Sequence, residues 1–537
     1  MKTFLRITIL LPLIALSLLG CKRGGSSSAQ ATRGAHQQEI TINITSEPQT
    51  LDPRKVRALN DANVIRMFMD GLTRTDKEGI TTLAVAKKVD ISPDQKTYTF
   101  TLRESHWSNG DQVTSHDFAY AWKKSLTPTF VAPNANLLYV IKNAKEANTG
   151  NLPLSLLGVE TPDEKTLVVN LNHPTPYFLD LIAHPIYFPV NAKVDRSNSH
   201  WAEKETSYVG NGPFTLLEWK HHNTIVAEKN PRYWDHKVVN LSHVKMVMVS
   251  EDTGFKMFDA KDTSWDGSPY SAIPIDAIQT LKTAEQLRCT PALATSWIRI
   301  NIEVPPFDSK KLRKAFALAI DRQAIVEHVL QGQQIPATGI VPKAMGLSDR
   351  PYFNDADIAA AQELFNEVLD EMGVSTSNFP EVVLTYGSGE RAHSVVQALQ
   401  SQWQTALGIR VRLEPVEKKV YFDRVSNKNY TLALGDWFAD FGDPINFLEV
   451  FTANAGTNNT NWKSPSYGEL LETSYQTSDK EERRQVLHKS EELIISEMPV
   501  IPLYHYTMLY IQDDNLKDVV LTTMGGLDFK WAHVDNE

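Results

Sequence analysis

Residues 97–122 read TYTFTLRESHWSNGDQVTSHDFAYAW, and in this stretch a strand pattern is followed closely by a helix pattern. Thr97–Leu102 alternates large apolar residues with threonine, which is typical of a half-buried β-strand. Ser115–Lys124 places apolar residues at helical spacing, and we predict a helix there with Ser115 as its N-cap. Strand and helix in such close succession favour a mixed α/β protein.

The same two patterns extend along the rest of the chain. Alternation predicts strands at Glu39–Thr45, Leu167–Leu171, Ile225–Glu228, Val382–Tyr386 and Ile409–Pro415. Amphipathic spacing predicts helices at Lys310–Leu330, where Asp321 and Arg322 interrupt the apolar face, and at Ala356–Met372, Ala392–Leu407 and Lys480–Ser496. Helices and strands therefore alternate, as in α/β folds. No long Pro- or Gly-rich linker follows residue 39, so we expect domains that are joined by more than one chain crossing.

Composition excludes several classes of protein. The chain has 537 residues, of which 42% are hydrophobic and 22% are charged, and its formal net charge is −10. These values are ordinary for a globular protein and exclude a disordered or multi-span membrane protein. Nucleic-acid binding needs clustered Lys and Arg, so an acidic chain without a basic block is a poor candidate for it.

The first residues predict export. Lys2 and Arg6 precede the uncharged run Ile7–Leu19, which is too short to span a bilayer comfortably but suits a signal peptide. The run ends at Cys21 and resembles the bacterial lipobox, in which the peptide is cut before a cysteine that receives lipid. We therefore expect a signal peptide at 1–20, a lipid anchor on Cys21 and a flexible tether at 21–38. An uncleaved anchor beside a chance cysteine is the alternative.

Sequence patterns for catalysis are lacking. We find no Gly-x-Ser-x-Gly, no His-Glu-x-x-His and no phosphate-binding glycine loop, and the histidines show no metal-ligand spacing. Asp440 and Asp443 are three residues apart, but Gly442 and Pro444 argue against a helix that would aim both at one substrate bond. The sequence therefore favours binding over catalysis, without a cofactor or metal.

Several ordered motifs resemble the family-5 extracellular solute-binding proteins, the binding components of peptide and nickel ABC importers. The stretch 97–122 carries the first of them, and the others that agree in order and spacing are GNGPF (210–214), NPRYW (230–234), PPF (305–307), AIDR (319–322) and PVIPLY (499–504). The resemblance covers about residues 39–535 and is strongest to the oligopeptide-binding members. It implies a monomeric, extracytoplasmic receptor in the periplasm or on the cell surface, which delivers short peptides to a permease.

The resemblance also implies a periplasmic-binding-protein fold of two lobes, with a ligand cleft between them and a hinge of two chain crossings. The implied domains are domain I at 39–70, 198–293 and 506–537, domain II at 71–197 and domain III at 294–505. Ligand binding would favour a closed state of the two lobes.

The resemblance further implies how a peptide would bind. A receptor for varied peptides reads the shared backbone, and strand addition is the physical means of doing so. The implied pairing segments are Arg57 to Leu59 and Asp436 to Phe438, with Trp437 as the wall of a side-chain pocket. Asp440 would hold the ligand's α-ammonium. Tyr139 and Tyr506 fall at further cleft positions.

The chain departs from the oligopeptide-binding pattern at cleft arginines. Leu434 and Val425 stand at two arginine positions, and Lys418 stands at a tryptophan position. The ligand carboxylate therefore needs another cation, for which Lys418, Arg391, His393, Arg424 and Arg57 are the candidates. These departures keep other functions open: the same fold with specialised cargo (a cell-wall peptide, a dipeptide, nickel or haem), a surface adhesin or sensor, or an enzyme.

Overall fold

The computed structural model describes residues 38–453 and 455–535. The predicted signal peptide and Cys21 lie outside these residues. Within them the largest sheet has eleven strands, with β13 (Ile335–Pro336) beside β17 and the others in the order β15 (Val411–Val416), β14 (Val382–Gly387), β16 (Leu432–Phe438), β12 (Arg288–Ile300), β17 (Val500–Gln512), β11 (Trp265–Gly267), β1 (Glu39–Asn43), β10 (His243–Val247), β9 (Thr224–Lys229) and β8 (Phe214–Lys220).

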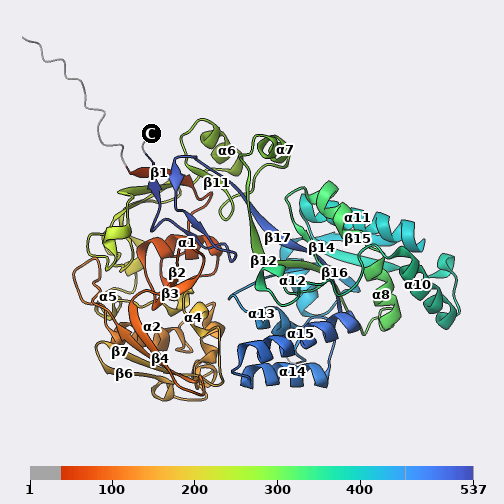
Figure 1. Ribbon diagram of the computed structural model, residues 1–537, viewed down its shortest axis with the longest axis horizontal. Coiled ribbons are helices and arrows are strands. Elements are labelled where there is room, and N and C mark those ends of the chain that lie inside the picture. Colours follow the sequence, from red (N-terminus) through yellow and green to blue (C-terminus); the bar gives the residue numbers. More distant parts are fainter. Residues whose placement is uncertain (1–37, 454, 536–537) are drawn as a thin grey trace, which may run out of the picture. The chain divides into compact units, whose positions relative to one another are not determined.

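Smaller sheets and helices complete the architecture (Figure 1). A four-stranded sheet has the order β4 (Ala86–Ile91), β5 (Thr97–Leu102), β7 (Thr166–Asn170) and β6 (Val159–Asp163), and two-stranded sheets pair β2 (Thr73–Thr75) with β3 (Thr81–Leu83), β18 (Leu516–Lys517) with β21 (His533–Val534), and β19 (Val520–Leu521) with β20 (Leu527–Asp528). The helices are α1 (Leu59–Phe68), α2 (Ser115–Ser125), α3 (Ala144–Asn148), α4 (Phe178–Leu181), α5 (Ala192–Ser197), α6 (Glu251–Asp259), α7 (Ile275–Thr283), α8 (Lys310–Leu318), α9 (Arg322–Ala324), α10 (Ile358–Met372), α11 (Glu390–Leu407), α12 (Lys418–Ser426), α13 (Ile445–Leu448), α14 (Pro465–Gln476) and α15 (Lys480–Glu497).

The predicted strands and helices are confirmed, with shifts of a few residues at their ends, but two details were wrong. The N-cap of α2 is Thr114, not Ser115, because the Asp117 carboxylate accepts hydrogen bonds from the Thr114 N–H (2.9 Å) and hydroxyl (3.0 Å). The predicted helix Lys310–Leu330 is divided. The Asp321 carboxylate caps a new start by accepting from Ala324 N–H at 2.8 Å, and a π-helical turn follows.

The long strands β12 and β17 connect two groups of elements in the large sheet (Figure 1). They pair antiparallel, and the register shifts between Pro291 and Thr295 and again at Ser296. Such irregularities are β-bulges, which bend a strand locally. The domain borders expected at 293/294 and 505/506 fall inside these two strands, and the borders themselves remain a prediction.

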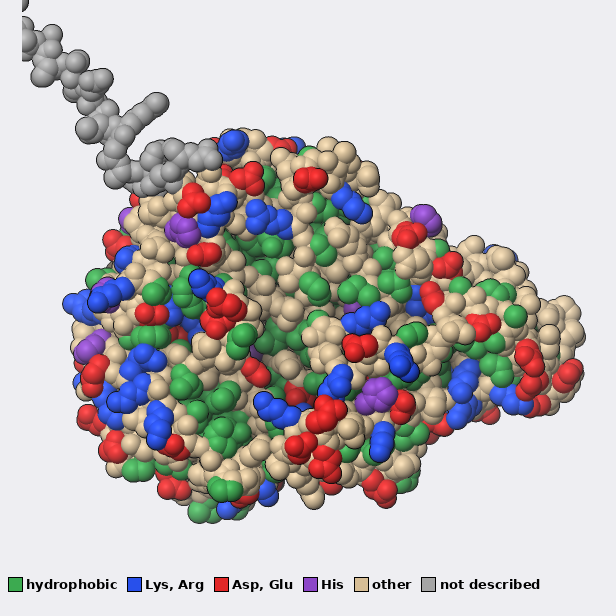
Figure 2. Space-filling model, viewed as in Figure 1, with side chains coloured by type: hydrophobic (Ala, Val, Ile, Leu, Met, Phe, Trp, Pro, Cys, Tyr) green, Lys and Arg blue, Asp and Glu red, His purple; other side chains and the backbone are tan. Residues whose placement is uncertain are grey.

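A large apolar core fixes these elements. Six tryptophans are almost fully buried: Trp107, Trp122, Trp201, Trp265, Trp297 and Trp403. On the face shown in Figure 2, acidic and basic side chains are interspersed. Among the described residues, no helix is both long and apolar enough to cross a membrane.

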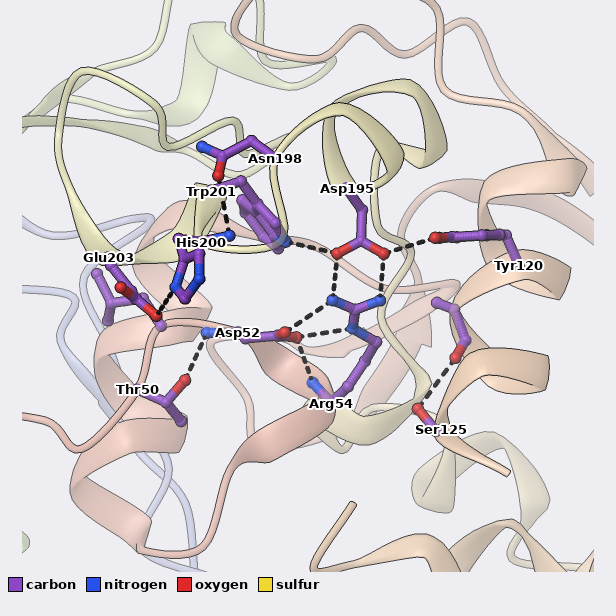
Figure 3. A network of polar contacts seen from close by, with 12 residues as sticks. Thr50, Asp52, Arg54, Tyr120, Ser125, Asp195, Asn198, His200, Trp201 and Glu203 are labelled. Carbon is purple, nitrogen blue, oxygen red and sulfur yellow. Dashed lines mark hydrogen bonds and ion pairs between the residues drawn. The ribbon is translucent and has the colours of Figure 1, made fainter. Parts of the chain in front are cut away.

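Buried ion pairs hold the chain segment just before the predicted ligand-binding residue Arg57 (Figure 3). Arg54 lies between Asp52 and Asp195, with N–O distances of 2.7 and 2.6 Å. The Tyr120 hydroxyl donates to Asp195 at 2.6 Å, and Trp201 Nε1 donates to it at 3.0 Å. Breaking a buried pair by removing one partner is strongly destabilising, so this network keeps the start of α1 in place.

Candidate functional site

A cavity of about 440 Å³, here called the main cavity, brings together two segments that are far apart in the sequence. Arg57, Ala58 and Leu59 line it from one side, and Phe438 to Asp440 line it from the other. Two larger hollows, of about 1000 and 950 Å³, contain no residue of β16. The main cavity is therefore the candidate site, because it alone of these three has residues of both predicted pairing segments in its wall, namely Arg57 to Leu59 and Phe438.

Strand β16 offers an unpaired backbone edge beside the main cavity. Its parallel pairing with β14 covers only Leu432 and Ala433, whereas its antiparallel pairing with β12 continues to Phe438. Just beyond, Ala439 N–H donates to Leu293 O at 2.9 Å. The backbone N–H and C=O groups of successive residues point to opposite sides of an antiparallel strand. Those of Leu434, Asp436 and Phe438 therefore point away from β12. This edge can accept another strand.

The segment before α1 complements that edge. The N–H groups of Arg57 and Ala58 point to the Asp61 carboxylate, and Ala58 O accepts from Ala62 N–H at 3.1 Å. The Arg57 C=O and the Leu59 N–H have no hydrogen-bond partner among the described residues. These two groups flank Ala58, which is the arrangement that one residue of a parallel strand requires for its own N–H and C=O.

Asp440 marks one end of the open edge, and Asn446 holds it there. Asn446 is buried, and its Oδ1 accepts from Trp437 Nε1 at 3.0 Å and from the Asp440 N–H at 3.1 Å. Part of the Asp440 side chain remains exposed. Surrounding protein atoms nevertheless raise the pKa of its carboxyl, because burial disfavours the charged form, while the Asn446 side chain acts in the opposite direction.

A side cavity of about 210 Å³ also opens at Asp440. Tyr139 lines it, as do Tyr475 and Glu449. The Tyr475 hydroxyl donates to Glu449 Oε2 at 3.1 Å. Burial, with smaller contributions from Asp440 and Asp443, raises the pKa of Glu449 to about 7. Asp443 is not free to act with Asp440, because Arg483 binds its carboxylate with two contacts of 2.8 Å.

The remaining residues predicted on the strand surround Phe438. The Phe438 ring is 60% exposed, which is unusual for a large apolar side chain, and it lies 5.1 Å from the Tyr506 ring. The Tyr506 hydroxyl donates to Asp436 Oδ1 at 2.6 Å. Trp437 lies outside the lining of both cavities and contacts Asn446 instead.

The cations proposed for the ligand carboxylate are, apart from Arg57, outside both cavities. Lys418 and Arg391 are exposed near the starts of α12 and α11. The His393 ring contacts the Tyr386 hydroxyl at 2.6 Å. Arg424 already has an acidic partner, since its Nη1 lies 2.6 Å from Glu414. Their roles toward a ligand remain predictions.

Sequence reasoning missed Arg299, which reaches the open edge from β12. Its Nη2 donates to Asp436 O and its Nη1 to the Tyr421 hydroxyl, both at 3.2 Å. Tyr421 in turn donates to Leu434 O. A Cβ added at Gly435 would overlap with the guanidinium, so the glycine leaves room for it. The only signal in the sequence is this glycine beside a strand with an arginine, which is too weak to predict the contact.

The arrangement can therefore bind an extended chain through backbone groups, with a carboxylate near one end. Among the described residues no group of three potential metal ligands occurs.

Comparisons with known proteins agree with this geometry. Residues 81–459 match the family model described as bacterial extracellular solute-binding proteins, family 5 Middle. The chain is 39% identical to the oligopeptide-binding protein OppA of Bacillus subtilis, covering 99% of this chain and 100% of that protein. It is 33% identical to the dipeptide-binding protein DppE of the same species, covering 97% of each chain.

A solved structure shows the same architecture. The crystal structure of Haemophilus influenzae OppA in complex with the peptide RPPGFSPFR matches with a TM-score of 0.76 and 29% identity, covering 93% of this chain and 99% of that one. The fold is thus the two-lobed α/β fold of the periplasmic binding proteins, as predicted. The chain belongs to the family-5 bacterial extracellular solute-binding proteins.

Proposed function

We propose that this protein binds short peptides as an added strand and delivers them to an ABC permease. One observation carries the proposal: Arg57 to Leu59 and Phe438 to Asp440 face one cavity, and both present free backbone groups to it. Backbone pairing does not depend on side chains, so a site of this kind accepts peptides of varied sequence. The relatives named oligopeptide- and dipeptide-binding proteins support this class of ligand.

Asp440 captures the α-ammonium of the peptide in this proposal. An ammonium group beside its carboxylate forms a charge-assisted hydrogen bond, which is stronger than a neutral one. The ligand supplies the positive charge that the surrounding protein lacks, and so offsets the burial that raises the pKa of this carboxyl. Asn446 limits the movement of both Trp437 and Asp440, so little ordering of the site is needed on binding.

The two long strands β12 and β17 act as the hinge. Domain I (39–70, 198–293 and 506–537) with domain II (71–197) forms one lobe, and domain III (294–505) forms the other. The β-bulges in the β12–β17 pair lie next to both proposed crossings, where a few residues can absorb a change in backbone angles. A peptide that contacts both pairing segments stabilises the closed state.

Calorimetry with defined peptides tests amine capture. Residues 39–537 are unfolded, freed of carried-over ligand, refolded and titrated with a pool of tri- to pentapeptides and with the same pool after N-acetylation. We expect binding of the free pool and at least about a hundredfold weaker binding of the acetylated pool, because the Asp440 carboxylate then lacks its charged partner in the closed site. Asp440→Asn should weaken binding of the free pool to a similar extent.

Asp423→Asn is the matched control, because Asp423 is an exposed carboxylate on α12. It should bind like the wild type. Equal binding of free and acetylated pools would contradict the role of Asp440 while leaving peptide binding intact. Failure of the refolded wild type to bind either pool would contradict the peptide proposal and favour specialised cargo or an adhesive role.

Lipid anchoring through Cys21 rests on the sequence pattern alone. We propose that the chain is cut before Cys21 and that the new N-terminal cysteine is acylated, which holds the receptor at the membrane beside its permease. Expression in a bacterial host with an alkyne-labelled fatty acid should label the wild type but not Cys21→Ser. Labelling of both forms, or of neither, would contradict the anchor.

A further inference from the structure

The carboxyl end of a bound peptide has no assigned partner, and the open edge of β16 suggests where this end must lie. Within the described part of the chain, neither the N–H nor the C=O of Phe438 has a hydrogen-bond partner on that edge. Two residues further along, the outward carbonyl of Asp436 is occupied by Arg299 Nη2 at 3.2 Å. Two residues beyond that, the Leu434 carbonyl is occupied by the Tyr421 hydroxyl. The unoccupied part of the edge is therefore short, and it ends at Arg299.

Arg299 carries a charge that the protein leaves without an acidic partner. The guanidinium is half-buried, and no carboxylate lies within 4.0 Å of it among residues 38–453 and 455–535. Its two hydrogen-bond acceptors, a backbone carbonyl and a hydroxyl, are both uncharged. By contrast, Arg54, Arg74, Arg322 and Arg483 each bind at least one carboxylate. Half-burying a charge without a partner costs free energy. An anion should therefore bind more favourably to Arg299 than to an exposed lysine.

Gly435 leaves the space through which the Arg299 side chain reaches the open edge of β16. Arg299 lies opposite Ala433 in the antiparallel register, two residues from Gly435 on the same face of the sheet. Its side chain must pass over Gly435 to reach the outward carbonyl of Asp436. A Cβ at position 435 would overlap with Nη1, so alanine or any larger residue would push the guanidinium away.

We infer that Arg299 binds the terminal carboxylate of the peptide and thereby makes tripeptides the preferred ligands. This inference rests on the proposed peptide function. With the α-ammonium at Asp440, the first residue lies opposite Phe438 in an antiparallel pairing, and the third lies opposite Asp436. The carboxylate of that third residue lies beside the Asp436 N–H and Arg299 Nη2. The guanidinium then exchanges a neutral carbonyl for a carboxylate, which it can bind with two parallel hydrogen bonds.

Titration with alanine peptides of two to six residues, each with a free and with an amidated C-terminus, tests the inference. For the wild type, we expect the tripeptide to bind most tightly, and amidation to weaken it about tenfold or more, because a hydrogen bond to a charged group is lost. In Arg299→Gln the free and amidated tripeptides should bind equally. Arg299→Lys should keep part of the difference, since it keeps the charge but loses the planar pair of donors.

Two controls separate this effect from misfolding. Arg288→Gln alters a half-buried arginine on the same strand, which lies 3.8 Å from Asp514, and should behave as the wild type. Arg299→Gln should still discriminate against N-acetylated tripeptide, which shows that the amine end is intact. An equal amidation penalty in the wild type and in Arg299→Gln would overturn the inference, as would a wild type without preference for length. Absence of binding to every peptide would overturn the peptide proposal as well.

Discussion

The two ends of the open edge of β16 are built in different ways. At the amine end, Trp437, Asp440, Asn446 and Glu449 lie within thirteen consecutive residues, and local hydrogen bonds hold them together. At the other end, Arg299 comes from β12 and Tyr421 from α12, and both meet at backbone groups of β16. One end is a local motif, whereas the other exists only after the sheet has formed.

The two ends also differ in charge. Asp440 and Glu449 carry raised pKa values because burial disfavours their ionised forms, and Asp440 contributes to the shift of Glu449. Arg299 is a cation among neutral acceptors. Opposite unpaired charges at the ends of one short edge match a zwitterion of fixed length. This complementarity sets the direction of a bound peptide, whereas the backbone between the ends contributes binding without sequence preference.

Removing both charges should have the largest effect. In an extended tripeptide the two termini are about 10 Å apart, so the losses from Asp440→Asn and Arg299→Gln should add as free energies. We expect the double variant to bind a free tripeptide more than about a thousandfold more weakly than the wild type, from about 3 and 1.5 kcal/mol for the two ends. Calorimetry of the wild type, both single variants and the double variant measures this. If the double variant bound free tripeptide as tightly as Asp440→Asn does, only the amine end of the peptide would contribute a charged contact.

Gly435→Ala should disrupt the carboxylate-binding end of the site without replacing any charged residue. The added Cβ displaces the Arg299 guanidinium. We expect about tenfold weaker binding of the free tripeptide, no change for the amidated one, and a loss of about 1–3 kcal/mol in unfolding free energy from overpacking. Denaturant unfolding and calorimetry measure the two effects. Unchanged selectivity for the free carboxylate would contradict the role of Gly435.

The difference between the ends explains what the sequence could predict. Asp440, Trp437 and Phe438 were predicted as site residues from the resemblance to family motifs that are contiguous in the chain, and their roles toward a ligand remain predictions. The strands were likewise predicted from alternation, and most helices from amphipathic spacing. Arg299 and Gly435 are separated by more than a hundred residues, and their contact depends on the order β14–β16–β12 in the sheet. Periodicity does not determine that order, so the five candidate cations were proposed from the resemblance without knowledge of which side chains reach the edge of β16.

The predicted helix Lys310–Leu330 failed for a related reason. Asp321 and Arg322 interrupt its apolar face, but the face resumes at Ile325, and periodicity alone therefore still indicates one helix. The Asp321 carboxylate instead accepts from Ala324 N–H, and the buried Arg322 is held by Asp355 at 2.7 Å and by Pro502 O at 2.8 Å. These tertiary contacts stabilise a new helix start and override the local pattern.

Asn446→Ala should weaken binding of the peptide amine, because Asn446 holds Trp437 and Asp440 in position. The change leaves the Trp437 Nε1–H and the Asp440 N–H without their acceptor. We expect a loss of about 1–3 kcal/mol in unfolding free energy, because donors near the core stay unpaired, and roughly fivefold weaker binding of free tripeptide from a less ordered Asp440. Asn458→Ala is a control for stability, since Asn458 is a buried asparagine that bonds loop backbone away from both cavities. Equal affinity of Asn446→Ala and wild type would contradict this positioning role.

The smallest expected effect is a pH dependence that belongs to the amine end alone. Glu449 faces Tyr475 from α14, together with Asp440 and Asp443, and its pKa of about 7 leaves it partly protonated in the empty site near neutral pH. A nearby ammonium favours the ionised form, so binding releases a proton below pH 7, and affinity should fall as pH decreases from 7 to 6. We expect about a threefold decrease in the wild type and a smaller one in Glu449→Gln, which lacks the carboxyl with a pKa of about 7. The α-amine itself loses its proton above about pH 8, which limits the range that can be compared. Arg299→Gln should keep the wild-type pH profile, since the change leaves Glu449 and Asp440 at the amine end unaltered. A profile that flattens in Arg299→Gln but not in Glu449→Gln would show that the two ends are coupled through the ligand, and the comparison between them would then have to be revised.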